Sequence, residues 1–279
     1  MELTQLSQNI AAVQERIASA ARAAGREPEE ITLCAATKVQ EDETIRAAIA
    51  AGIRVCGENR VQELAQHQRG DAYAGAQVHF IGHLQTNKVR QVVGQVELIQ
   101  SVDSLRLLQA IQGQAEKLDL VQDILLEVNI AREESKGGCL PEQLEELLDF
   151  SSGLSHVRLR GLMAIPPVSA APGDNRRYFA QLRQLFIDIR SKMSDNQKHM
   201  NCLSMGMSAD YEDAVAEGAT LVRVGSAIFG PRPPAPHGAQ VSAPHRSSEV
   251  LAGSAAHRKR GFPCPCRDGR AESGDGRKK

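Results

Sequence analysis

Eight short β-rich runs follow one another along the first 230 residues, and a helix-length stretch separates each of them from the next. The runs cover residues 31–38, 53–59, 78–84, 96–102, 121–130, 159–165, 202–208 and 220–229. Near-continuous apolar strands are typical of parallel sheets that helices cover on the outside. Eight of them in this length match the strand number of a (β/α)8 barrel and approach its usual size. The sequence therefore predicts an α/β fold, a single TIM barrel, over residues 1–230.

An open doubly wound sheet is the alternative fold for this pattern. It is less favoured, because no run is followed by the spaced glycines of a dinucleotide-binding turn. Ahead of the first run, apolar residues recur at spacings of three and four from Leu3 to Ala24, and Gly25 follows as a C-terminal cap. We expect one amphipathic helix there, added to the barrel.

The composition changes at Pro231. Residues 231–279 hold seven of the twelve prolines and 10 Lys and Arg against 4 Asp and Glu, with few large aliphatic residues. Such a segment buries too little apolar surface to offset the entropy lost on ordering. We predict a disordered basic tail over 231–279, and the composition favours a solvated extension without a role over a basic arm for anionic partners.

The charge of the remaining chain limits the partners to be expected. The first 230 residues hold 23 Lys and Arg against 30 Asp and Glu, whereas nucleic-acid phosphates require a basic face. The longest apolar runs are strand-sized, and the first residues lack the basic start and apolar run of a secretory signal. We therefore expect a cytoplasmic protein that binds neither nucleic acid nor membranes.

Six cysteines are present without the spacing of a disulfide framework. Cys34, Cys56 and Cys202 lie within apolar runs, where a reduced thiol behaves as a small hydrophobic side chain. Cys264 and Cys266 form a lone pair without histidines in register, which is a weak indication of metal binding. We expect core thiols and no metal site.

Lys38 closes the first β-run, at the end of a barrel where reactive groups gather. Strand alternation places Thr32, Cys34 and Ala36 on the same face as Lys38, and small side chains on an inward face leave room for a ligand beside the ammonium. A partly desolvated lysine is a competent Schiff-base nucleophile. The alternative is a lysine that ends the strand and reaches solvent.

The loops after the seventh and eighth runs suit a phosphate group, which barrels often bind at this position. They read Ser204-Met205-Gly206-Met207-Ser208 and Gly225-Ser226. Small residues let backbone N–H groups approach an anion, and hydroxyls add donors. Each loop alone is more often a turn. Together with Lys38 they place an amine and a phosphate cradle around one cavity, which is what a pyridoxal phosphate site requires.

Arg223 and Asn59 complete the predicted site. Arg223 shares a strand face with Gly225, so it is expected to face the middle of the ligand, with the pyridine nitrogen as its partner; a carboxylate on a neighbouring strand is the alternative. A guanidinium only donates, which leaves the ring a poorer electron sink than an aspartate partner does. Asn59 is expected to bind the ligand's ring oxygen or the lysine. His83 is a rim residue of either structural or acid–base role, and Glu127 is assigned to the scaffold.

Several long motifs, in order, resemble one family. They are Ala36-Thr37-Lys38, residues 57–63 (GENRVQE), residues 79–88 (HFIGHLQTNK), Gly161-Leu162-Met163, residues 203–208 (LSMGMS) and residues 223–230 (RVGSAIFG). The chain is identified over residues 1–230 as similar to the pyridoxal phosphate homeostasis proteins, the YggS/PROSC family, whose fold is that of the alanine racemase barrel domain. Residues 231–279 depart from the family pattern.

The resemblance implies that Lys38 holds pyridoxal phosphate as a Schiff base, that Ser204, Gly225 and Ser226 hold the phosphate, and that Arg223 meets the pyridine nitrogen. It also implies a cofactor carrier without an established reaction, which buffers pyridoxal phosphate or delivers it to apoenzymes. We expect a monomer. A pyridoxal phosphate-dependent racemase or lyase acting on amino acids and a barrel aldolase whose Lys38 attacks a sugar phosphate are the alternatives.

Overall fold

The computed structural model describes residues 2–168, 171–192 and 199–231. These residues belong to one compact unit that ends at Pro233. The predicted tail, except for Pro231, lies outside the described residues, and so do Cys264 and Cys266.

Eight parallel strands form a closed barrel in chain order, as the sequence predicts. The strands are β1 (Thr32–Ala36), β2 (Val55–Glu58), β3 (Gln77–Phe80), β4 (Leu98–Val102), β5 (Gln122–Glu127), β6 (Val157–Met163), β7 (Cys202–Ser204) and β8 (Leu221–Val224). The barrel closes where β1 pairs with β8, with Cys34 opposite Arg223. Every strand coincides with a predicted run or overlaps it, so the (β/α)8 prediction is confirmed.

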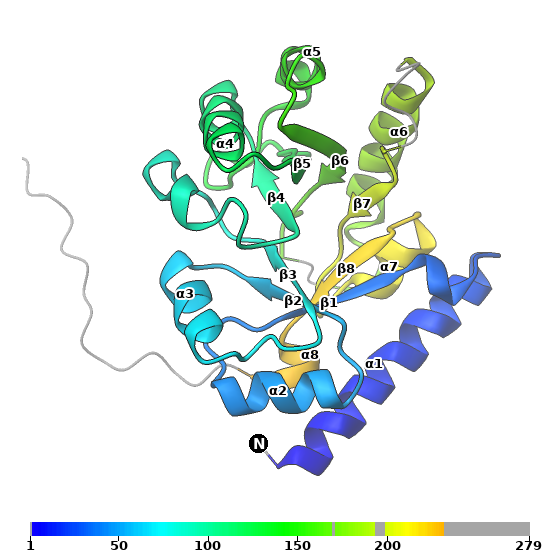
Figure 1. Ribbon diagram of the computed structural model, residues 1–279. Helices are drawn as coiled ribbons and strands as arrows, with labels where there is room; N and C mark the ends of the chain where they lie inside the picture. Colours follow the sequence, from blue (N-terminus) through cyan, green and yellow to red (C-terminus); the bar gives the residue numbers. More distant parts are fainter. Residues whose placement is uncertain (1, 169–170, 193–198, 232–279) are drawn as a thin grey trace, which may run out of the picture. The chain divides into compact units, whose positions relative to one another are not determined.

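Helices surround these strands (Figure 1). The α-helices are α1 (Leu3–Ala23), α2 (Asp42–Ala50), α3 (Val61–Arg69), α4 (Leu105–Lys117), α5 (Leu144–Ser152), α6 (Arg176–Lys192), α7 (Tyr211–Ala216) and α8 (Ser226–Phe229). Three short 3-10 helices are also present: η1 (Pro28–Glu30), η2 (Thr86–Gln91) and η3 (Pro141–Gln143). Two βα units depart from the regular pattern: β3 is followed by η2 where an α-helix is expected, and β8 is followed by α8, which has a single turn.

The opening helix α1 covers the side of the barrel next to α8. Its buried stripe consists of Leu6, Ile10, Val13, Ile17 and Ala21. The helix packs against α7, α8 and α2, and the Asn9 side chain donates to the Ile228 carbonyl oxygen at 2.9 Å. This packing explains why apolar residues recur at spacings of three and four in the opening segment. The buried stripe of α1 covers the side of the barrel where a full eighth βα unit would supply a longer helix.

The apolar core has two parts. The larger cluster fills the space between the strands and the surrounding helices. The smaller cluster fills the barrel interior and contains Cys34, Ala36, Val55, Ile81, Leu98, Leu125, Met163 and Leu221. Cys34 and Ala36 are therefore inward-facing, as alternation along the first β-run predicts.

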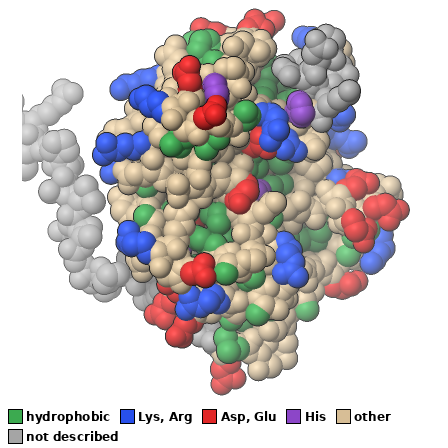
Figure 2. Space-filling model, in the orientation of Figure 1, with side chains coloured by type: hydrophobic (Ala, Val, Ile, Leu, Met, Phe, Trp, Pro, Cys, Tyr) green, Lys and Arg blue, Asp and Glu red, His purple; other side chains and the backbone are tan. Residues whose placement is uncertain are grey.

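The described residues contain no helix long and apolar enough to cross a membrane. They also hold no group of three or more His, Cys, Asp or Glu side chains placed to bind a metal ion. On the face displayed in Figure 2, Lys and Arg side chains are interspersed with Asp and Glu and form no continuous basic surface among the described residues.

Candidate functional site

A cavity of about 310 Å³ opens at the carboxyl ends of the strands. Six of the eight predicted site residues line it: Lys38, Asn59, Ser208, Arg223, Gly225 and Ser226. Ser204 and Met205 do not line it. Both are fully buried, Ser204 at the end of β7 and Met205 directly after it.

The segment that carries Lys38 is held by two carboxylates. Thr37 is buried, and its hydroxyl donates to the Glu58 carboxylate. The Val39 N–H donates to Glu63 Oε2 at 3.0 Å. Val39 has φ of 60°, which is costly for a β-branched residue and persists only where the surroundings fix the backbone. The half-buried Lys38 between them is therefore presented from a fixed backbone.

Glu58 is the last residue of β2 and is fully buried, in contact with Thr37. Burial raises the pKa of its carboxyl group, and hydrogen bonding from Thr37 opposes that shift. Its second oxygen, Oε2, has no hydrogen-bond partner in the described structure, and the same holds for Tyr73 Oη and His67 Nε2. His67 uses its other ring nitrogen, Nδ1, to contact Asp42 Oδ1 at 2.6 Å. The Thr37 hydroxyl is thus the principal group that stabilises the ionised form of Glu58.

Arg223 reaches the cavity from β8 and is 4% exposed. Its guanidinium donates to the Ser204 hydroxyl and, at 2.9 Å, to the Ala164 carbonyl oxygen. Burial lowers the pKa of the guanidinium. Lys38 and Arg223 are the two charged residues in the described lining, which contains no Asp or Glu. The cavity is therefore suited to an anion.

The loops after β7 and β8 meet at one oxygen atom. Gly206 has φ of 90°, and a Cβ there would lie 2.5 Å from the Ala214 Cβ, so this turn requires glycine. The turn places Ser208 Oγ 3.1 Å from the Gly225 nitrogen and 3.3 Å from the Ala227 nitrogen. Two backbone N–H groups at the start of α8 thus converge on one oxygen, an arrangement that also fits a phosphate oxygen.

Glu127 ends β5 near this site and is 7% exposed. Burial raises the pKa of its carboxyl group to about 7, with a further contribution from Asp103 and an opposing one from Arg223. Sequence reasoning assigned Glu127 to the scaffold and did not foresee this shift. His83, the other rim residue considered, is exposed and does not line the cavity.

Sequence reasoning also missed Gln100 and His79, which are buried inside the barrel and connected to Arg223 through Ser204. The available signal was a glutamine within the otherwise apolar part of the run at 96–102. Ser204 was expected at the phosphate, but its hydroxyl contacts Gln100 and Arg223 in the barrel interior. A second and larger cavity, of about 760 Å³, lies at the opposite end of the barrel.

Comparison with known proteins places this barrel in a known class of protein folds. Residues 2–233 match the family model of the alanine racemase N-terminal domain. A pyridoxal phosphate homeostasis protein of Aquifex aeolicus is 43% identical over 81% of this chain and 97% of its own. The chain belongs to the family of pyridoxal phosphate homeostasis proteins.

Two solved structures agree with this assignment. A protein of unknown function from Bifidobacterium adolescentis has a TM-score of 0.77 and 38% identity, covering 81% of this chain and 95% of that one. PipY of Synechococcus elongatus, solved with pyridoxal phosphate bound, has a TM-score of 0.70 and 33% identity, covering 81% of this chain and 100% of PipY.

Proposed function

We propose that this protein binds pyridoxal 5′-phosphate as a Schiff base on Lys38 and serves in the homeostasis of that cofactor. The observation that carries the proposal is the cavity at the carboxyl ends of the strands, whose described lining has two cationic side chains, Lys38 and Arg223, and no acidic one. A volume of about 310 Å³ is in the range of small-molecule sites. The names and bound ligand of the relatives support the same cofactor.

Each part of the cofactor has a complementary group in the cavity. Lys38 would bond to the aldehyde carbon, and the loops that carry Ser208, Gly225 and Ser226 would hold the phosphate. Arg223 would face the pyridine nitrogen, and Asn59 would bind the ring oxygen or Lys38. Ser204 and Met205 support the site without lining the cavity. The Ser204 hydroxyl accepts a hydrogen bond from the guanidinium of Arg223, and Met205 packs in the apolar core below the loop.

The chemistry of these groups favours retention of the cofactor over turnover. Pyridoxal phosphate supplies an aldehyde to amines and an electron sink for amino-acid carbanions. Arg223 donates hydrogen bonds and carries no proton that it readily gives up, so it does not strengthen that sink. The described lining contains no His, Tyr, Cys or carboxylate that would serve as a second acid or base beside Lys38. We infer that the protein carries the cofactor and delivers it to apoenzymes.

The test is to load the purified protein with pyridoxal phosphate and record its visible spectrum before and after adding a pyridoxal phosphate-dependent apoenzyme. A visible band that declines as the apoenzyme becomes active supports carriage and delivery. A protein without a visible band would contradict cofactor binding. Racemisation or cleavage of added amino acids, followed by chiral chromatography, would replace carriage with the racemase or lyase alternative.

A further inference from the structure

Two loops that line the cofactor cavity are joined by a pair of buried polar side chains. Asp210 lies directly before α7 and is 6% exposed, and Asn175 lies directly before α6 and is 2% exposed. Asn175 Nδ2 donates to Asp210 Oδ2 at 2.7 Å and to the Pro167 carbonyl oxygen at 2.9 Å. Asp210 and Asn175 do not themselves line the cavity. They therefore influence it through the segments that they hold.

One of these segments is the loop after β7. The Met207 N–H donates to the other carboxylate oxygen, Asp210 Oδ1, at 2.7 Å, and the Asp210 N–H donates to the Met207 carbonyl oxygen at 3.0 Å. The loop closed by these two bonds carries Met207 and Ser208, which both line the cavity. The Ser208 hydroxyl in turn accepts from the Gly225 and Ala227 N–H groups at the start of α8. Asp210 thus fixes the place of Ser208 relative to those N–H groups.

The other segment is the loop after β6. Ile165 lines the cavity from this loop, and Pro167 follows two residues later. Because Asn175 holds the Pro167 carbonyl group, Asp210 joins the loop after β6 to the loop after β7. A carboxylate offers two equivalent acceptor oxygens, whereas a carboxamide offers one. An uncharged side chain of the same shape therefore reproduces only one of the two connections.

A buried carboxylate close to a phosphate site requires an explanation, because like charges repel and burial of a charge is costly. The hydrogen bonds from the Met207 N–H and from Asn175 Nδ2 satisfy Asp210, and hydrogen bonds to an ionised acceptor are stronger than those between neutral groups. They hold the loop after β7 in place from within the protein. Little further ordering is then needed when an anion binds to this loop, which favours binding.

We propose that Asp210 is a positioning residue that makes the cavity selective for the phosphorylated cofactor over pyridoxal, which lacks the phosphate. Asp210 acts on the phosphate end of the cavity through Met207 and Ser208, and on the loop after β6 through Asn175. The proposal rests on the proposed binding of the phosphate by the loops after β7 and β8. Lys38 follows β1 and lies outside the segments that Asp210 holds, so bonding of the aldehyde should not depend on Asp210.

The experiment compares pyridoxal 5′-phosphate with pyridoxal, in the unmodified protein and in Asp210→Asn. Each compound is titrated into the cofactor-free protein, and the visible band gives the dissociation constant. In the variant, either the Met207 N–H or the Asn175 amide loses its acceptor. We expect binding of pyridoxal 5′-phosphate to weaken by about tenfold or more and binding of pyridoxal to change by less than about threefold. A role of Asp210 in folding alone would affect both compounds alike.

Asp213→Asn is the matched control on α7. The Asp213 carboxylate accepts the Gly173 N–H at 2.8 Å and Arg176 Nε at 3.0 Å, so it also joins α7 to the segment around the start of α6. Neither of these two contacts involves the loop after β7. Asp213→Asn should therefore change the ratio of the two dissociation constants by less than about threefold.

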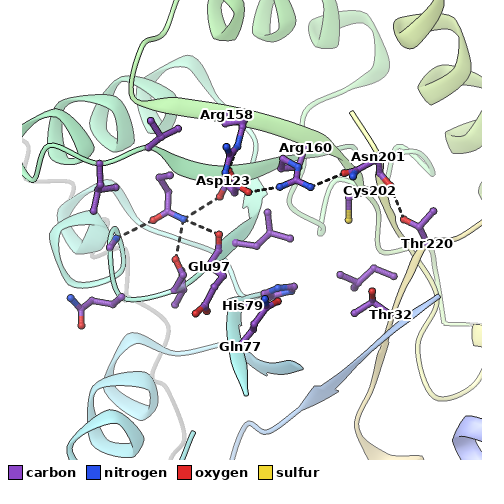
Figure 3. Close-up of a pocket in the computed structure, with 18 of the residues that line it drawn as sticks. Thr32, Gln77, His79, Glu97, Asp123, Arg158, Arg160, Asn201, Cys202 and Thr220 are labelled. Carbon is purple, nitrogen blue, oxygen red and sulfur yellow. Dashed lines mark hydrogen bonds and ion pairs between the residues drawn. The ribbon is translucent and has the colours of Figure 1, made fainter. Parts of the chain in front are cut away.

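Asp123→Asn controls for the general effect of removing a carboxylate that accepts two hydrogen bonds. Asp123 accepts from Arg158 Nε at 2.5 Å and from Arg160 Nη1 at 2.6 Å, in the larger cavity at the opposite end of the barrel (Figure 3). Any loss of stability at that end should leave the ratio of the two dissociation constants unchanged.

Asn175→Ala serves if Asp210→Asn does not fold. It removes the connection to Pro167 and keeps the bond from the Met207 N–H to Asp210. Binding of pyridoxal 5′-phosphate should weaken by about threefold or more, and binding of pyridoxal should weaken less.

A phosphorylated ligand without an aldehyde separates this test from the proposed function. Deoxypyridoxine 5′-phosphate, in which a methyl group replaces the aldehyde, cannot bond to Lys38, and calorimetry measures its binding. Asp210→Asn should weaken that binding by about tenfold or more. If pyridoxal 5′-phosphate gives no visible band, the Schiff base on Lys38 fails, whereas calorimetry still decides the role of Asp210.

Three results would overturn the role of Asp210. The first is that Asp210→Asn weakens binding of pyridoxal 5′-phosphate and pyridoxal by the same factor. The second is that the variant binds deoxypyridoxine 5′-phosphate as tightly as the unmodified protein does. The third is that Asp213→Asn or Asp123→Asn changes the ratio of the two dissociation constants as much as Asp210→Asn does.

Discussion

Thr37 donates its hydroxyl hydrogen to the Glu58 carboxylate in the barrel wall, one residue before Lys38. Both residues are fully buried, and the other carboxylate oxygen has no partner in the described structure. This hydrogen bond is one of the two contacts with carboxylates that hold the segment presenting Lys38, and the other runs from the Val39 N–H to Glu63.

Replacing Thr37 by valine preserves the shape and removes that donor. The buried carboxyl group of Glu58 then loses its side-chain partner, which should lower the free energy of unfolding by about 1–3 kcal/mol. Thr32→Val, an exposed position on the same strand, is the matched control and should change it little. Urea unfolding followed by circular dichroism compares the two; equal midpoints would show that the Thr37 bond is not significant.

Ser226 lies at the start of α8, where the phosphate is expected. Ser226→Asp should weaken cofactor binding more than Ser226→Ala, since a carboxylate repels the phosphate whereas alanine loses one hydroxyl donor, at about 1–3 kcal/mol. Titration of each variant with pyridoxal phosphate gives the two dissociation constants. If they are the same, the phosphate is bound elsewhere.

The raised pKa of Glu127 predicts a pH dependence of stability. Because the folded protein holds this proton up to about pH 7 and the unfolded chain only to about pH 4.5, the folded state binds more protons in that window. The contribution of Glu127 to the free energy of unfolding is thus complete below pH 4.5 and decreases as the pH rises to 7. Glu127→Gln abolishes the decline.

Relative to the unmodified protein, the Glu127→Gln variant should therefore gain about 3 kcal/mol of unfolding free energy between pH 4.5 and pH 7. Denaturant unfolding of the cofactor-free protein at several pH values measures the difference. Parallel pH curves for the two proteins would mean that Glu127 titrates normally in the folded state.

Helix α1 should contribute to barrel stability through its buried stripe. Ile10 is fully buried, so Ile10→Ala should cost about 2–5 kcal/mol from lost burial and the cavity left behind. Leu3 is on the same helix and 65% exposed, so Leu3→Ala should have a small effect. Chemical unfolding of both variants tests this, and a similar loss for the two would argue against specific docking of the helix.

The barrel and most of its cofactor cavity could be predicted from the sequence because both depend on local patterns. Apolar β-runs mark the strands, and parallel strands bring their carboxyl ends together, which places Lys38, Asn59 and Gly225 around one opening. Alternation along the first run also gave the inward direction of Cys34 and Ala36 correctly.

Ser204, Gln100 and His79 show where such reasoning stops. β7 has three residues, Cys202–Ser204, so the sequence does not reveal whether Ser204 belongs to the strand or to the loop above it. The contacts of Gln100 with Ser204 and His79 join residues on three strands, and their meeting depends on the stagger of the closed barrel. Local periodicity carries no information on that stagger.

The most direct test of the central claim is to reduce the pyridoxal phosphate-loaded protein with borohydride and locate the modified residue by peptide mass spectrometry. Our account predicts a phosphopyridoxyl group on Lys38, and a Lys38→Ala variant that folds but has neither the adduct nor the visible band. An adduct on a different lysine of the unmodified protein, or a yellow and reducible Lys38→Ala variant, would contradict the assignment of Lys38 as the residue that holds the cofactor.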